Sequence, residues 1–178
     1  MFDKSQRIIG DIAENIKTLV RPIQPDRHPT SKFYIFERYI DVIMCGALIG
    51  FRFNRKGETQ SDLSKSEYST ESQLIEIPIN TMLKEQGNLK RIYRLIMLNE
   101  DDRKLPADER INNAFRYSRD EDERVKANMK LFESYISGGI EILIDRFRDI
   151  LTQEEAVEQM QRLYEDIQMT DEESIIIG

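Results

Sequence analysis

The residues best suited to catalysis are few in this sequence of 178 residues, which has one cysteine and one histidine. His28 lies in a proline-rich turn, and Cys45 lies in an apolar run typical of a buried helix. A catalytic Cys–His pair needs an exposed thiol of low pKa, so we interpret Cys45 as a packing residue. Two soft ligands are too few for a zinc site.

Carboxylates that could bind Mg²⁺ are easy to find in a chain that is 33% charged. Glu121, Asp122 and Glu123 stand in the predicted first turn of a helix, and Asp145 and Asp149 lie one turn apart further along. Solvated acids on helix faces are the ordinary explanation of such pairs. The sequence also lacks the GxxxxGK[ST] and GxGxxG motifs. We therefore expect no enzymatic activity, no cofactor and no resident metal, and keep a metal-dependent nuclease as a third alternative.

The first of two basic clusters offers more. Arg52, Arg55 and Lys56 follow an apolar helix directly, and Phe51 and Phe53 alternate with them. Phosphates pair with arginine and bases stack on aromatic rings. Cations are equally favoured at a helix C-terminus by the helix dipole alone, and the two phenylalanines can pack inward.

The second basic cluster consists of Lys90, Arg91 and Arg94, on the exposed side of a helix predicted over residues 89–99. Both clusters leave the same three interpretations open: solvated structural charge, a contact to nucleic acid or phosphate, or a contact to an acidic partner protein.

Charge is distributed unevenly along the chain. The net charge is -7, yet residues 1–57 carry ten Lys and Arg against six Asp and Glu. Residues 152–173 hold eight acids and one arginine, and they would repel nucleic acid. Any phosphate-binding face must therefore be local, and most of the basic excess lies in the first third of the chain.

Hydrophobic periodicity predicts most of the chain as amphipathic helices. The predicted helices cover residues 4–20, 32–49, 89–99, 107–117, 118–151 and 152–168. Residues 32–49 are apolar on nearly all sides, which predicts a central buried helix, and Gly50 suits the left-handed position after its end. Thr152 and Glu155 form a capping box at the start of the last helix.

Glycines mark the places where helices are expected to break or to pack closely. Gly87 and Asn88 predict a break before the 89–99 helix. Gly138 and Gly139 interrupt the 118–151 pattern, which predicts a kink, a break, or a close backbone approach by another helix.

Three segments fall outside this helical pattern. Residues 57–74 begin with a glycine and are rich in Ser, Thr and Glu, which predicts a polar flexible loop. Residues 74–79 alternate apolar and polar, which allows a short strand. Residues 169–178 form a tail whose isoleucines at 175–177 could form an edge strand, pack on the body or meet a partner.

These elements predict an all-α fold, a compact single-domain bundle of five to six helices spanning residues 1–178. One cysteine excludes an internal disulfide and fits a reducing compartment. The longest apolar run, Val42–Phe51, is shorter than the roughly 20 residues that span a bilayer. The first 20 residues lack the apolar core of a signal peptide. We expect a cytoplasmic protein with no membrane contact.

Two stretches resemble a known family. "IDVIMCGALIGFRFNRKGE", residues 40–58, resembles the segment of small Dnd-system-associated proteins in which an apolar helix runs into a short basic turn. "FESYISGGIEILIDRF", residues 132–147, resembles their later motif, an aromatic-containing helix passing through a small-Gly-Ile step. The family is encoded beside bacterial DNA phosphorothioation genes.

The resemblance implies a non-enzymatic accessory protein of a bacterial restriction-modification or defence system, and it carries over no catalytic residues. The implied partners are other proteins of that system and, through a local basic patch, DNA. The second hypothesis is an oligomeric protein-interaction module unrelated to DNA, which would use the 175–177 tail or the Gly138-Gly139 helix.

Overall fold

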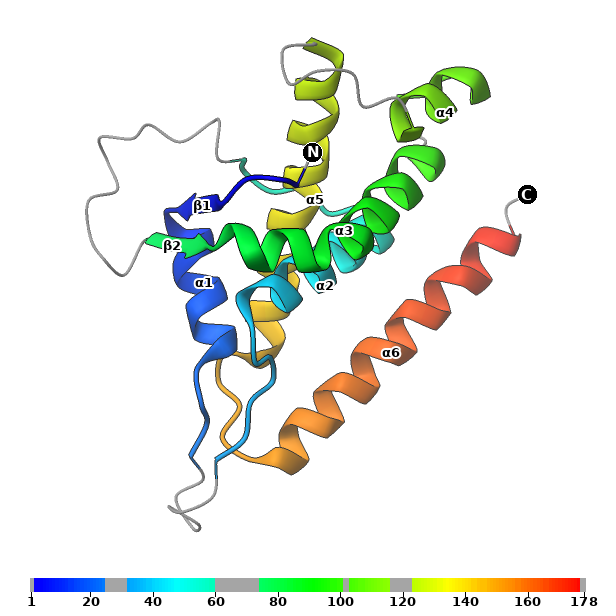
Figure 1. The fold of residues 1–178 in the computed structure, drawn as a ribbon. Coiled ribbons are helices and arrows are strands. Elements are labelled where there is room, and N and C mark those ends of the chain that lie inside the picture. The colour runs from blue at the N-terminus through cyan, green and yellow to red at the C-terminus, as the bar shows by residue number, and fades with distance from the viewer. Residues whose placement is uncertain (1, 25–31, 60–73, 101–102, 116–122, 177–178) are drawn as a thin grey trace.

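The computed structural model describes residues 2–24, 32–59, 74–100, 103–115 and 123–176, with side chains up to Met169. Within these ranges the chain forms six helices and one two-stranded sheet (Figure 1). The elements are β1 (Gln6–Ile9), α1 (Asp11–Val20), α2 (Tyr39–Arg52), β2 (Leu74–Ile77), α3 (Ile79–Asn99), α4 (Ala107–Phe115), α5 (Glu123–Phe147) and α6 (Gln153–Ile176). The predicted helical bundle with a short strand is confirmed.

The sheet pairs two strands that lie more than 60 residues apart in the sequence. β1 and β2 are antiparallel, with Ile9 opposite Leu74. The strand expected near residues 74–79 is confirmed, but the helix expected from residue 4 is wrong, because α1 begins only at Asp11. Ile8 and Ile9 fit a helical spacing, but β-branched residues also suit strands. Their partner strand lies too far along the chain to be seen in a local pattern.

Helices α2 and α5 pack against each other at the centre of the molecule, and glycines allow their backbones to touch (Figure 1). A Cβ placed on Gly139 would lie 1.8 Å from the carbonyl oxygen of Gly46. One placed on Gly50 would lie 1.9 Å from the carbonyl oxygen of Tyr135. α5 continues through this region as one helix. The paired glycines of α5 therefore mark a close approach by another helix, one of the three predicted outcomes, and not a break.

Helix α2 is the predicted central helix with different ends. It spans Tyr39–Arg52, whereas residues 32–49 were expected. The chain before it is still extended, since Phe33 forms a bridge with Ile23. Gly50 lies inside the helix, and Asn54, with φ 46°, takes the left-handed position after it. The glycine is needed for packing, and asparagine tolerates the turn.

Helix α3 runs without interruption for 21 residues, so the break predicted at Gly87 and Asn88 is wrong. Glycine in a helix interior costs about 1 kcal/mol relative to alanine. Buried side chains on both sides of it, Met82 before and Leu89 and Tyr93 after, hold the two halves on one core face. Tertiary packing thus outweighs the local preference.

Helix α6 begins with the predicted capping box. The Thr152 hydroxyl accepts a hydrogen bond from the Glu155 amide at 3.2 Å, and the Glu155 carboxylate accepts one from the Thr152 amide at 3.2 Å. The helix extends to Ile176, well past the predicted end at residue 168. The tail predicted from residue 169 is therefore mostly helical, and the edge-strand alternative is wrong.

Two further predictions concern the loop after α2 and the absence of a membrane-spanning helix. The polar loop predicted over residues 57–74 falls mostly on residues 60–73, which lie outside them. Among the helices that the structure does describe, none combines the length and the apolar character that crossing a membrane requires.

Candidate functional site

The first basic cluster sits on a tight turn that ends α2. The amide of Asn54 donates to the Phe51 carbonyl at 3.1 Å, and the amide of Arg55 donates to the Gly50 carbonyl at 2.8 Å. This pair of bonds is a Schellman motif, which satisfies the last carbonyls of the helix. The chain then turns onto α5, where the Gly57 amide donates to the Ser134 carbonyl at 2.9 Å. The turn therefore places the basic residues next to α5 of the same chain.

The two arginines of this cluster bind acceptors on other helices. Arg52 donates from Nε and Nη2 to the backbone carbonyl of Ile167 in α6, at 3.2 and 2.6 Å. Arg55 donates from Nε and Nη2 to the carboxylate of Glu141 in α5, at 3.2 and 3.0 Å. Both side chains thus tie the end of α2 to its neighbours.

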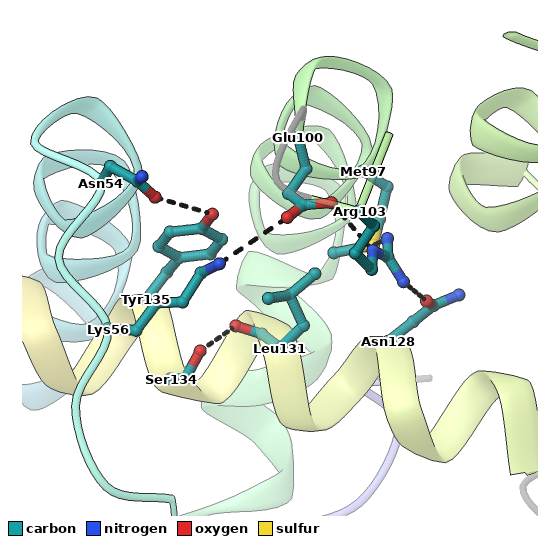
Figure 2. Close-up of polar contacts among 9 residues, drawn as sticks. All are labelled: Asn54, Lys56, Met97, Glu100, Arg103, Asn128, Leu131, Ser134 and Tyr135. Atoms are coloured by element: carbon teal, nitrogen blue, oxygen red, sulfur yellow. Dashed lines mark hydrogen bonds and ion pairs between the residues drawn. The ribbon is translucent and has the colours of Figure 1, made fainter. Parts of the chain in front are cut away.

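Lys56 reaches across an aromatic ring to a buried acid. Its Nζ lies 5.1 Å from the centroid of the Tyr135 ring and 3.7 Å from Oε1 of Glu100. Figure 2 shows the lysine side chain extending over the ring toward the carboxylate. A cation over an aromatic face is stabilised by the ring quadrupole. The lysine is therefore held by two partners of its own chain.

Glu100, which caps the end of α3, is the centre of this network and is only 1% exposed. Arg103 donates from Nε to Oε2 of Glu100 at 2.8 Å and from Nη1 to Oδ1 of Asn128 at 2.8 Å (Figure 2). Oε1 has no hydrogen-bond partner among the described residues. Lys56 faces that oxygen, so its charge offsets the cost of burying the carboxylate. The network joins the ends of α2 and α3 to α5.

The second basic cluster lies on the side of α3 that faces away from the core. Arg91 is exposed, whereas Lys90 and Arg94 are half-buried along their stems. The guanidinium of Arg94 lies 4.9 Å from the centroid of the Phe115 ring in α4. Lys84, six residues before Lys90 in α3, adds a fourth cation.

Apolar side chains share this side of α3. Leu83 is 50% exposed and Leu95 is 45% exposed. With Gly87 and Arg91 they repeat every four residues, which places all four on one ridge of the helix. We call Leu83, Lys84, Gly87, Lys90, Arg91 and Leu95 the outer face of α3.

The only acid within α3 points elsewhere. Glu85 accepts hydrogen bonds from Arg38 and from Asn88, each at 2.8 Å. The bond from Arg38, followed by that from Asn88, lowers the pKa of Glu85 below its usual value. Glu85 is thus engaged on the inner side, and the cations of the outer face have no acid of α3 beside them on that face.

Those residues considered for catalysis that the structure describes are not brought together. Cys45 is half-buried, and burial raises the pKa of its thiol to about 11, which disfavours the reactive thiolate. His28, Glu121 and Asp122 lie outside the described residues. Asp145 and Asp149 are exposed on the last turns around α5. In the part of the chain that the structure describes, no three His, Cys, Asp or Glu side chains are grouped so as to hold a metal ion.

Sequence reasoning found both basic clusters but missed the acceptors of the first. Glu100 lies 44 positions from Lys56. Glu141 lies 86 positions from Arg55, and Ile167 lies 115 positions from Arg52, so no local spacing connects the basic residues with their acceptors. The one local signal is the three-residue separation of Glu100 and Arg103, a spacing that pairs opposite charges on helices and turns.

Comparison with known proteins adds no relative. No family model matches the chain, and neither the curated proteins nor the solved structures contain a match.

Proposed function

We propose that this protein is a non-enzymatic accessory component of a bacterial DNA phosphorothioation-linked defence system, and that it works by binding a partner protein through the outer face of α3. The observation that carries the proposal is the composition of that face. Arg91 lies on one ridge with the exposed Leu83 and Leu95, and Lys84 and Lys90 lie beside that ridge. This composition suits a partner with an acidic and apolar surface.

The defence context is supported by the position of the family resemblance. Residues 40–58 cover α2 and the turn after it, and residues 132–147 cover the second half of α5. These are the two segments whose glycines pack backbone against backbone. The resemblance therefore falls on parts that build one structural unit.

The first basic cluster supports a structural role better than a binding role. Arg52, Arg55 and Lys56 each contact an acceptor or a ring of their own chain. An external ligand would have to compete with those partners. For this reason the proposal assigns binding to Arg91 and its neighbours on α3.

The proposal is tested by co-purification with the proteins of a phosphorothioation system expressed together with this chain. We expect one of them to form a stable complex that Arg91→Glu weakens by about tenfold or more. Lys126→Glu, which changes an exposed lysine on α5, is the matched control and should leave the complex intact. A complex with none of these proteins would overturn the proposal.

DNA binding is a second candidate, favoured by the cations at helical spacing on the same face. Phosphate contacts are recognised by a steep loss of affinity with salt, with a slope of about 0.9 per neutralised phosphate in a logarithmic plot. Anisotropy measurements on duplexes with and without phosphorothioate links would measure that slope. Affinity that is undetectable at low salt would exclude this candidate.

A further inference from the structure

Helix α6 has an apolar stripe that is wider than the surface it buries. Ala156 and Leu163 are buried against the body. Val157, Met160 and Tyr164 follow the three- and four-residue spacing of the same stripe, yet they are 58%, 46% and 60% exposed. We call these three residues the outer stripe of α6. Scattered exposed apolar residues are normal, whereas contiguous exposed apolar surface is typical of interaction sites.

The inner side of α6 is fixed to its own molecule, so the outer stripe cannot turn inward. Arg52 holds the carbonyl of Ile167, and Arg146 forms an ion pair with Asp166. In Figure 1, α6 runs along the edge of the bundle. Among the residues that the structure describes, none covers the outer stripe.

The charge around the outer stripe indicates what a partner surface must present. Residues 153–169 contain five acids and one arginine. Glu155 belongs to the cap and Asp166 to the inner ion pair. The other three, Glu154, Glu158 and Glu165, are exposed, and Glu158 pairs with Arg162 at 2.5 Å. Glu154, Val157 and Glu158 also border a shallow hollow on this side of the helix. A complementary surface must combine exposed apolar groups with cations.

The outer face of α3 has this composition. It presents Leu83 and Leu95 together with Lys84, Lys90 and Arg91. The acid of α3, Glu85, is held by Arg38 and Asn88 on the other side. The two surfaces therefore match in apolar content and are opposite in charge.

Gly87 adds an independent feature. Glycine inside a helix costs stability, and the glycines of α2 and α5 compensate by letting another helix approach. A Cβ on Gly87 would meet no atom within 4 Å. It is thus a helical glycine with no packing role within the described chain, at the middle of the outer face of α3. It leaves a flat seat where the backbone of a partner helix can come close.

We propose that the protein self-associates, with the outer stripe of α6 from one copy packed on the outer face of α3 of a second copy. A two-fold axis makes the contact reciprocal, so that each dimer contains it twice. The inference goes beyond the proposed function, since it needs neither the defence context nor DNA. Both use the outer face of α3, so the partner protein of the proposed function would have to displace the second copy.

The test is sedimentation velocity of the full chain over a range of micromolar concentrations. We expect a monomer–dimer equilibrium that weakens as salt is added. Tyr164→Asp should weaken the dimer by about tenfold or more, because it places a charge in the apolar contact. Tyr34→Asp is the matched control: it makes the same change at an exposed tyrosine that belongs to neither α3 nor α6, and it should leave the dimer unchanged.

A charge exchange tests the pairing directly. Glu165 is exposed and directly follows Tyr164 of the outer stripe, so it is the acid chosen for the exchange. Arg91→Glu and Glu165→Arg should each weaken the dimer, and the two changes combined should restore it in part, which a merely destabilised fold would not do. Circular dichroism of each variant checks that the helices are retained.

Three results would overturn the proposed contact between α6 and α3: a monomer at all concentrations, a dimer insensitive to Tyr164→Asp, or no recovery in the combined variant. A monomer whose Arg91→Glu variant still loses its defence-system partner would overturn the inference and leave the proposed function standing. A charge-sensitive dimer that binds no protein of that system would support self-association and overturn the proposed function.

Discussion

Glycines and basic residues occur both at the central pair of helices, α2 and α5, and on the outer face of α3, but they serve different purposes in the two regions. At the centre, Gly50 and Gly139 remove side chains so that two backbones of one chain can touch. On α3, Gly87 removes a side chain where nothing in the described chain approaches. The basic residues differ in the same way, since Lys56 is held by Glu100 and Tyr135, whereas Arg91 is exposed. One region has its partners within the molecule, and the other presents groups suited to partners outside it.

The largest expected effect tests the centre. Gly139→Ala would bring a Cβ to within 1.8 Å of a backbone oxygen that cannot move without separating the helices. We expect a loss of about 3 kcal/mol or more in the free energy of unfolding, or failure to fold. Urea denaturation followed by circular dichroism measures it. Normal stability would show that the two backbones do not touch as described.

The next effect tests the buried network. Arg103→Met would leave the Glu100 carboxylate with Lys56, at 3.7 Å, as its one cation among the described residues. We expect a loss of about 2–3 kcal/mol, because a buried carboxylate loses its closest counter-charge. Lys126→Met breaks the exposed pair with Glu123 and should change stability by about 0.5 kcal/mol or less. Equal effects of the two changes would mean that Glu100 is not buried.

A smaller effect concerns the start of α6, at the periphery. Thr152→Ala removes the capping hydroxyl and should cost about 1 kcal/mol in the free energy of unfolding. Urea titrations of the variant and of the unchanged chain measure the difference. An unchanged free energy of unfolding would show that the Thr152 hydroxyl does not stabilise the start of α6.

The same capping box predicts a pH dependence. Hydrogen bonds from the amides of Leu151 and Thr152 lower the pKa of Glu155. A carboxyl group with a lowered pKa in the folded state stabilises at pH above its unfolded value of about 4.3 and loses this contribution as pH falls through the folded value. The difference in melting temperature between the chain and its Glu155→Gln variant should therefore shrink in acid. A constant difference would contradict the capping role.

The smallest effect has the opposite sign and sharpens the contrast between the glycines. Gly87→Ala should stabilise the monomer by about 0.5–1 kcal/mol, since the added methyl meets open space and alanine favours the helix. If Gly87 seats a partner helix, the same change should weaken self-association. Urea denaturation and sedimentation measure the two effects separately, and destabilisation of the monomer would show that the site is already filled.

Several features could be predicted because they depend on residues close in sequence. The capping box needs only Thr152 and Glu155, and the core face of α3 follows from the spacing of Leu89, Tyr93 and Met97. The second basic cluster was found for the same reason, because a helical spacing determines which side chains oppose the core. The strand β1 was missed since its partner is more than 60 positions away.

The amino-acid sequence by itself determined the helices, the cap of α6 and the apolar character of α2, because each depends on contacts between residues three or four positions apart. Only the tertiary structure decided which glycines touch a neighbouring backbone and which basic residues find partners in their own chain. Gly87 and Gly139 are both glycines inside α-helices, and Lys56 and Arg91 are both cations. What distinguishes them is the distant segment packed against each, and that depends on the packing of the whole chain.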